Sequence, residues 1–252
     1  MPLRDPKKMY GFLRHSISVC TELARVLQFD KTHKWHVILV SLYGSMLELA
    51  NSICVLVEGD SPIGIPILLR SMLEAFVDFS NLKETRTYGY HIDAAHVKEW
   101  IRILEEAKRG DNPYLAEISK LPNLDNILSD YKKQLKELEN KGYAPLSHFQ
   151  KFDKSDQSKE YRSFYNFLCC DAHNNIRSLI SRHADIAKDH SDYQLQFFPP
   201  IDLDSIVHYI DSCIGILIAS TEMIHKALGS RMTSEVEQLA TQLYEIRKPW
   251  QA

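Results

Sequence analysis

Apolar residues recur at spacings of three and four along almost the whole chain, which is the period of helices with one buried face. Together with the turn residues between the apolar runs, this pattern predicts helices over 7–29, 63–83, 87–109, 124–140, 158–184, 203–228 and 231–246. A further helix is predicted between the first two of these, capped by Asp30 or Thr32 and ending at Val57. Only the connection at 185–203 has room for a short extended piece. We therefore expect an all-α fold, with residues 1–252 forming a single domain built as one multi-helix bundle.

The segment 111–156 differs in character from the rest of the chain. Lys, Glu, Asp and Asn dominate it, with one amphipathic helix predicted at 124–140 and the pattern of a loop at 142–158. It holds too few apolar residues for a core of its own. We expect a charged insertion or arm on the bundle and not a second domain.

Composition and cysteine usage narrow the class of protein. The chain has 252 residues, a net charge of −3 and 44% hydrophobic residues, as a soluble globular protein has. Five cysteines and a charged N-terminus without a secretory signal indicate free thiols in a reducing cytoplasm. The apolar stretches 37–57 and 206–228 carry ionisable groups at mid-span, so we expect core helices and no membrane segment. The sequence has no Gly-rich phosphate loop, CxxC pair or nucleophile elbow, which argues against nucleotide-binding folds, zinc fingers and α/β hydrolases; we expect no cofactor.

Charged residues form a stripe on the most apolar of the predicted helices, 63–83. Arg70, Glu74 and Asp78 recur every four residues and so line one face. Because an isolated charge is costly to bury, these groups must pair with one another or face a polar cleft. A structural salt bridge and a functional site between helices both fit this stripe.

A second polar stripe lies on the predicted helix 158–184. His173 and Arg177 are four residues apart, so a continuous helix would point both the same way. A single histidine on such a face is commonly a core residue, whereas a histidine with an arginine one turn away also suits a site that handles charge. From both stripes we take His173, Arg177, Arg70 and Glu74 as candidate catalytic residues, and Tyr165, Asn174 and Asp78 as candidate binding residues.

Two motifs on these helices resemble a bacterial all-helical family of unknown function. They are L-L-R-S-M-L-E, from Leu68 to Glu74, and Y-N-F-L-C-C-D-A-H, from Tyr165 to His173. In that family an R-x-x-x-E helix is followed about ninety residues later by Y-x-x-L-S-x-x-x-H, and the likeness extends from about residue 35 to 228. The family's usual Ser is Cys169 here, which weakens a role for a hydroxyl at this point. The resemblance implies a helical fold with a polar Arg/Glu/His site and no particular reaction. Because the charged groups need partners and the resemblance pairs the two motifs, we expect Arg70 and Glu74 to contact each other, or Tyr165 and His173.

The run from Arg177 to His183 resembles a second group, the HEPN superfamily of helical bundles, in which a late helix carries R-x(4–6)-H. That resemblance implies a metal-independent ribonuclease of a toxin or anti-phage system, a homodimer, and His183 as a further catalytic residue. His183 lies six residues beyond Arg177, about 240° around a regular helix. The two would therefore share a site only if the helix end unwinds or a second chain contributes.

The leading hypothesis is an endoribonuclease that binds RNA. His173 or His183 would transfer the 2′-hydroxyl proton, Arg177 would hold the phosphate and Asn174 would orient the substrate. In a second hypothesis, the polar groups are a structural network in a module that binds a partner protein. A third hypothesis is a carboxylate-bridged metal site, for which the chain offers Glu48, Glu74 and Glu222-x-x-His225, with Asp93-x-x-His96 in place of the missing second Glu-x-x-His.

Overall fold

A computed structural model of the chain describes residues 5–173, 175–186, 192–198, 200, 202–230 and 234–248. The longer helices are α1 (Pro6–Arg25), α2 (Lys34–Glu58), α3 (Ile65–Glu84), α4 (Tyr88–Arg109), α6 (Leu124–Asn140), α11 (Leu203–Ala227) and α12 (Ser234–Arg247). The shorter ones are η1 (Pro62–Gly64), η2 (Pro113–Leu115), α5 (Ala116–Ser119), α7 (His148–Lys154), α8 (Ser158–Glu160), the π-helical turn η3 (Tyr161–Tyr165), α9 (Asn166–Ala172) and α10 (Ile176–His183). Two short strands, β1 (Ala184–Ile186) and β2 (Tyr193–Leu195), form one antiparallel hairpin. The predicted all-α fold is confirmed.

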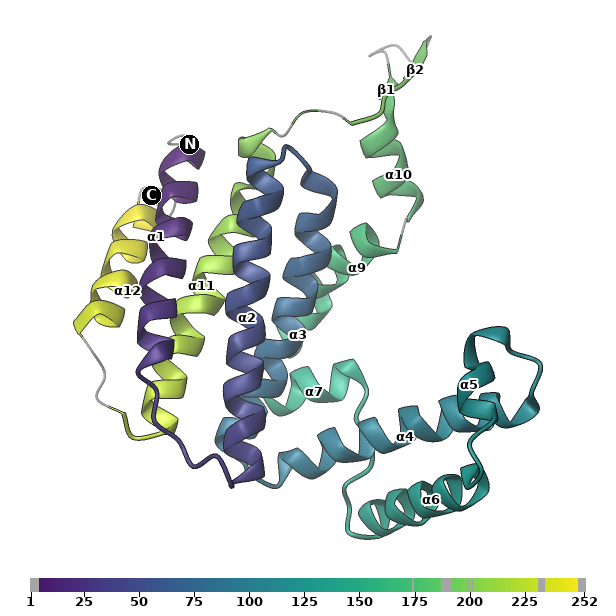
Figure 1. Ribbon diagram of the computed structural model, residues 1–252. Helices are drawn as coiled ribbons and strands as arrows, with labels where there is room; N and C mark the ends of the chain where they lie inside the picture. The colour runs from purple at the N-terminus through teal and green to yellow at the C-terminus, as the bar shows by residue number, and fades with distance from the viewer. Residues whose placement is uncertain are drawn as a thin grey trace.

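The main core lies within a bundle of α1, α2, α3 and α11, with α12 packed on its outer side (Figure 1). α3 contacts α2, α9 and α11, and its apolar side chains at Leu69, Met72 and Val77 are fully buried, as its composition predicted. Within the described part of the chain, α2 and α11 are long and apolar enough to cross a membrane by length and composition. Both pack in the bundle core, which is the arrangement that the sequence predicted for them.

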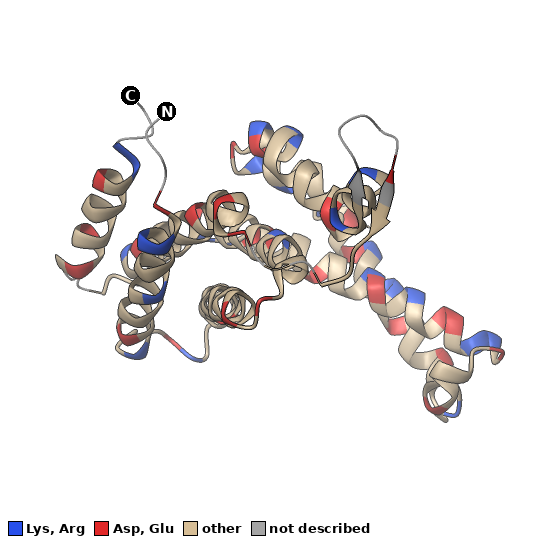
Figure 2. Ribbon diagram, turned by 90° about the horizontal axis from the view of Figure 1, so that it is seen from above, with Lys and Arg blue, Asp and Glu red and all other residues tan. Residues whose placement is uncertain are grey.

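The second half of α4 leaves the bundle and carries α5 and α6 as a projecting arm (Figure 1). Leu104 of α4 packs with Leu124 and Leu128 of α6 in a small apolar cluster, apart from the main core. Acidic and basic residues are interspersed along the arm (Figure 2). The helix predicted at 124–140 is confirmed with the same first and last residues.

The prediction of a loop at 142–158 is wrong, because α7 lies within it. Ser147 caps this helix: its hydroxyl accepts a hydrogen bond from the Gln150 backbone N–H, and the Gln150 side chain accepts one from the Ser147 backbone N–H. Phe152 is buried in the main core, so α7 packs against α3 and is not part of the arm. A seven-residue helix with one buried apolar side chain is too short to show a hydrophobic period.

The single helix predicted over 158–184 is also wrong. The structure divides the segment into α8, η3, α9 and α10, and α9 ends just before His173. Asn175 starts α10 as its cap, since its side chain accepts a hydrogen bond from the Arg177 backbone N–H. His173 and Arg177 therefore do not lie on one continuous helical face. α10 and the hairpin project beyond the end of the bundle (Figure 1).

Candidate functional site

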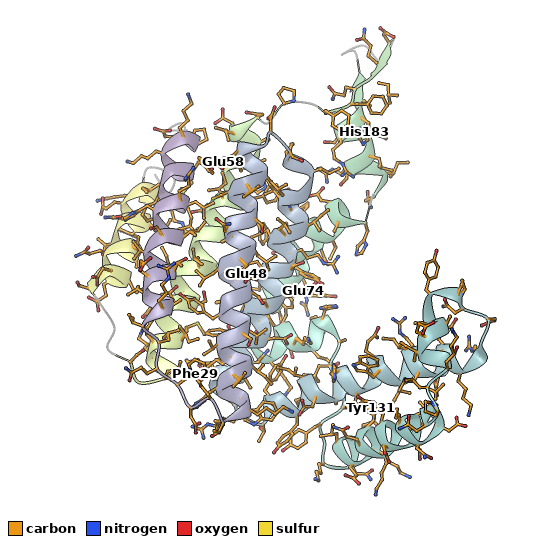
Figure 3. All side chains as sticks on the ribbon, viewed as in Figure 1. Phe29, Glu48, Glu58, Glu74, Tyr131 and His183 are labelled. Carbon is orange, nitrogen blue, oxygen red and sulfur yellow. The ribbon has the colours of Figure 1, made fainter. Side chains whose placement is uncertain are left out.

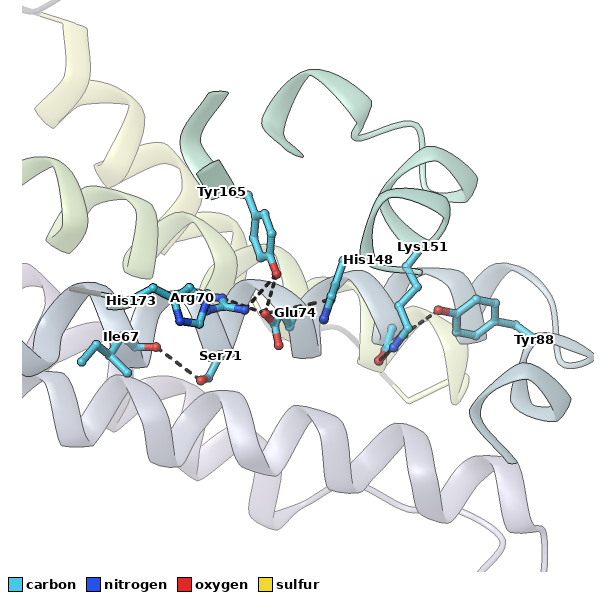
Figure 4. Close-up of polar contacts among 10 residues, drawn as sticks. Ile67, Arg70, Ser71, Glu74, Tyr88, His148, Lys151, Tyr165 and His173 are labelled. Atoms are coloured by element: carbon cyan, nitrogen blue, oxygen red, sulfur yellow. Dashed lines mark hydrogen bonds and ion pairs between the residues drawn. The ribbon is translucent and has the colours of Figure 1, made fainter. Parts of the chain in front are cut away.

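α3 presents Arg70 at the centre of a group of hydrogen-bonded side chains (Figure 4). Its Nε donates to Glu74 Oε1 at 3.0 Å, one turn further along the same helix. Its Nη2 donates to the Tyr165 hydroxyl at 3.3 Å, and its Nη1 lies 2.7 Å from His173 Nε2. The contact predicted between the two sequence motifs is confirmed. Below, "Arg70 cluster" means Arg70, Glu74, Tyr165, His173 and the neighbouring His148.

Tyr165 connects the cation and the carboxylate of this cluster. Its hydroxyl accepts from Arg70 and donates to Glu74 Oε1 at 2.7 Å, while its ring, 3% exposed, packs on Tyr161 and Phe152. Burial, and next the hydrogen bond to Glu74, raise the pKa of Tyr165, so the hydroxyl keeps its proton at neutral pH and remains a donor. Tyr165 is the last residue of η3, and π-helical turns of this kind are frequent at functional sites.

The contact between Arg70 and His173 fixes the state of the imidazole. A guanidinium can only donate, so Nε2 of His173 accepts from Nη1 of Arg70. The imidazole is then neutral, with its proton on Nδ1. Because His173 is exposed at the end of α9, a ligand can reach it from solvent. A ligand that takes over the Arg70 donor would leave Nε2 free to accept a proton.

His148, at the start of α7, is a neighbour of the cluster that the sequence did not predict. Its Nδ1 lies 4.0 Å from Glu74 Oε1, and its ring centroid lies 5.9 Å from that of Tyr165. When protonated, His148 forms an ion pair with Glu74, and its side chain is 50% exposed. The capping pair Ser147 and Gln150 was the sequence signal that could have placed a helix start, and His148 with it, at this point.

Asp78 belongs to a second polar group on the same face of α3. Its carboxylate accepts from the Tyr88 hydroxyl and from Lys151 Nζ, the latter at 2.8 Å. Asn81 Nδ2 donates to the Lys151 carbonyl, also at 2.8 Å. These bonds join α3, α4 and α7 (Figure 4). Asp78 therefore holds α7, and with it His148, against α3.

The structure places Arg177 and His183 elsewhere. Arg177 lines a cavity of about 520 Å³, and His183 lines a neighbouring one of about 480 Å³. Within the described residues, neither side chain hydrogen-bonds to a member of the Arg70 cluster, and Figure 3 shows His183 well apart from Glu74. The expectation that Arg177 is the partner of His173 is therefore corrected, since Arg70 is that partner. Asn174 lies outside the described residues.

The residues of the metal-site hypothesis do not come together. Asp93 pairs with Lys34 Nζ at 2.6 Å, and Glu74 pairs with Arg70. The imidazole of His225 is buried, with its Nδ1 2.8 Å from Ser230 Oγ, and burial lowers its pKa. In the part of the chain that the structure describes, no group of three His, Cys, Asp or Glu side chains is placed to hold a metal ion.

The Arg70 cluster combines two imidazoles, one guanidinium and one carboxylate on a face that solvent can reach. The side chains of Arg70 and Glu74 are 20% and 31% exposed. A guanidinium at such a position can bind an oxyanion, and imidazoles can accept and donate protons near neutral pH. The arrangement therefore has the groups needed to bind and polarise a phosphate-like anion.

Comparison with known proteins identifies a family for this chain. A family model described as a family of unknown function (DUF5677) matches residues 36–192, more than half of the chain. The matched range contains both motifs of the Arg70 cluster, from Leu68 to Glu74 and from Tyr165 to His173. Searches of curated proteins and of solved structures find no match.

Proposed function

Because the chain belongs to DUF5677, a family whose function is unknown, its chemistry must be inferred from the site, and we propose a metal-independent endoribonuclease that acts at the Arg70 cluster. The observation that supports this proposal is the pair of imidazoles, His173 and His148, beside one guanidinium on an exposed face. Cleavage of RNA at its own 2′-hydroxyl requires a proton acceptor, a proton donor and a cation for the phosphate, and no metal ion.

Each group has a distinct role in the proposed reaction. His173 accepts the proton of the 2′-hydroxyl, whose oxygen forms a bond to the adjacent phosphorus. The bond from phosphorus to the 5′-oxygen breaks, and protonated His148 gives its proton to that oxygen. Arg70 stabilises the charge that develops on the non-bridging oxygens. The products are a 2′,3′-cyclic phosphate and a 5′-hydroxyl, and the number of protons on the protein is unchanged.

The contacts of the free protein suggest how binding starts the reaction. Nε2 of His173 is occupied by Arg70 Nη1 at 2.7 Å, so it cannot accept a substrate proton in this state. A phosphate that binds Arg70 competes for that donor and releases Nε2. Glu74 and Tyr165 meanwhile keep hold of Arg70 through Nε and Nη2. Phosphate binding thereby frees the base beside the 2′-hydroxyl whose proton it accepts.

A non-catalytic module that binds a partner protein is the second candidate. The observation in its favour is that Arg70, Glu74 and Tyr165 are each hydrogen-bonded to the other two, as the members of a structural network are. In that case the cluster fixes the position of α9 against α3 and catalyses no reaction. The two candidates differ in what a mutation removes, which is activity in one and stability in the other.

Cleavage of a labelled single-stranded RNA in the presence of a metal chelator tests the proposal. His173→Ala and His148→Ala should each lower the rate by about 10²–10⁴-fold, the contribution of one general acid or base. Both imidazoles are substantially exposed, so melting temperatures should hardly change. His15→Ala is the matched control, because His15 is exposed on α1, at the other side of the bundle (Figure 1).

The outcomes separate the candidates. A wild-type protein that cleaves no RNA, together with a marked loss of stability in His173→Ala, supports the structural network and ends the proposal. Loss of cleavage in Arg177→Ala and His183→Ala with a silent His173→Ala would move the chemistry to α10. We extend the proposal to a toxin or anti-phage role, in which RNA cleavage arrests growth. Expression of the wild-type chain should then slow growth, and expression of His173→Ala should not.

A further inference from the structure

Two cavities lie side by side where α9, α10 and α11 meet. The first, of about 480 Å³, is lined by Phe197, Phe198, Arg182 and His183 among others. The second, of about 520 Å³, is lined by Phe164, Phe167, Arg177 and Arg182 among others. Each cavity thus combines two phenylalanines with basic side chains, and Arg182 borders both. Both volumes are in the range of small-molecule sites.

Three of these phenylalanines are unusually exposed to solvent for large apolar side chains. Phe198 is 97% exposed, Phe197 64% and Phe167 59%. A group of exposed apolar side chains of this kind marks a surface that binds something. Phe198 also has a positive φ of 53°, which is rare for an aromatic residue and costs free energy. Asp60, on the rim of the same cavity, has a φ of 51°. The backbone is therefore strained at the place where the ring is presented.

The wall between the cavities is held by hydrogen bonds from three helices. The carboxylate of Asp171 accepts from Ser178 Oγ at 2.7 Å and from the Tyr209 hydroxyl at 3.1 Å. Arg182 Nε donates to the Ser178 carbonyl at 3.0 Å, which anchors the arginine to α10. Asp171, Tyr209 and Arg182 line both cavities, so this wall is fixed before any ligand binds.

Two helices, α3 and α9, contribute residues both to the cavities and to the Arg70 cluster or its immediate neighbourhood. Pro66, which lines the first cavity, is four residues before Arg70 on α3, a rise of about 6 Å. Asp171, which lines both, is two residues before His173. A chain that binds in the cavities can therefore continue directly to Arg70.

We propose that these two cavities bind two consecutive nucleotides of single-stranded RNA and deliver the strand to the Arg70 cluster. This inference rests on the proposed function and names its substrate class. Bases of a single strand have free faces that stack on aromatic rings, whereas those of a duplex are stacked on each other. Arg182, between the cavities, is placed to contact the phosphate that joins the two nucleotides, and Arg177 the phosphate beyond it.

The carboxylate of Asp171 adds a preference among bases. A carboxylate has about four acceptor positions, of which the two hydrogen bonds here use two. The remaining positions can accept from the exocyclic amino group of cytosine, a group that uracil lacks. The surface should therefore bind oligocytidine more tightly than oligouridine.

Binding is tested separately from cleavage with a fluorescent 2′-O-methyl oligocytidine, which has no 2′-hydroxyl and cannot be cleaved. Phe198→Ala and Phe167→Ala should each raise the Kd measured by fluorescence anisotropy about tenfold, the usual effect of losing one stacking ring. Tyr114→Ala is the matched control, because Tyr114 is 94% exposed but lies on the arm, and its Kd should equal that of the wild type. Oligouridine of the same length should bind more weakly.

Each result supports or overturns the inference. No binding by the wild type, or an unchanged Kd in both phenylalanine variants, overturns it. A wild-type dimer that Phe198→Ala turns into a monomer with unchanged affinity for RNA also overturns it, because the surface would then join two copies of the chain. Binding without cleavage of the corresponding unmodified RNA contradicts the proposed function alone. Cleavage that both phenylalanine variants leave unchanged contradicts the binding surface alone.

Discussion

Replacing Tyr165 by Phe removes one oxygen atom from the centre of the Arg70 cluster and leaves the packing of the ring in place. That oxygen donates to Glu74 at 2.7 Å and accepts from Arg70 at 3.3 Å. A hydrogen bond to a charged group contributes about 1.5–3 kcal/mol. The charged partners are 20% and 31% exposed, so water replaces part of what is lost. We expect the free energy of unfolding to fall by about 1–2 kcal/mol, and the Tm by about 2–8 °C for a chain of this size.

Urea unfolding followed by circular dichroism measures this change, provided that the m-value stays constant. Tyr161→Phe is the control, because Tyr161 stacks on Tyr165 with ring centroids 5.1 Å apart, and its hydroxyl has no hydrogen-bond partner within the described residues. We expect Tyr161→Phe to stay within about 0.5 kcal/mol of the wild type. If Tyr165→Phe lowers the free energy of unfolding no more than Tyr161→Phe does, the Tyr165 hydroxyl does not stabilise the cluster, and Arg70 is not held in place by it.

Three further predictions concern the scaffold. Burial raises the pKa of five of the described tyrosines above the usual value of about 10, so the folded chain holds these protons more tightly than the unfolded chain. The contribution of these protons to stability is complete below about pH 10, the pKa of tyrosine in the unfolded chain, and is lost as the pH rises above it. Unfolding should therefore need less urea at about pH 11 than at about pH 8. The five are Tyr10, Tyr43, Tyr88, Tyr165 and Tyr209. Asp78→Ala should lower the free energy of unfolding by about 2 kcal/mol, since it leaves the mostly buried Lys151 without its carboxylate; urea unfolding checks this. Gly89→Ala should cost about 1–3 kcal/mol, because its Cβ would meet the Trp35 ring at 2.4 Å, whereas Gly44→Ala, with open space in α2, should raise the Tm slightly.

The hydrophobic period predicted the long helices well. The bounds of α6 were correct at both ends, and α3 was correctly identified as a central helix, because long amphipathic or fully apolar segments have a strong period. The need of buried charges for partners, together with the resemblance that pairs the two motifs, predicted the contact of Arg70 with Glu74, Tyr165 and His173. These features depend on local geometry or on a strong energetic constraint.

The errors arose where a helix cap or a tertiary contact, and not the hydrophobic period, decides the structure. α9 ends at Ala172 and a separate helix, α10, starts at Ile176, because the Asn175 side chain caps α10. The period alone cannot show this, so Arg177 was assigned to the wrong group of residues. α7 was missed because its stability comes from Phe152 in the core and Lys151 on Asp78, and neither contact is local in sequence. His148 was missed with it.

We propose that the Arg70 cluster cleaves RNA by proton transfer between histidines and without a metal ion. Analysis of the ends of RNA fragments formed in excess chelator tests it most directly. We expect wild-type protein to produce 2′,3′-cyclic phosphate and 5′-hydroxyl ends, and folded His173→Ala to produce almost none. RNA that stays intact with the wild-type protein, or cleavage that the chelator abolishes, would contradict the claim.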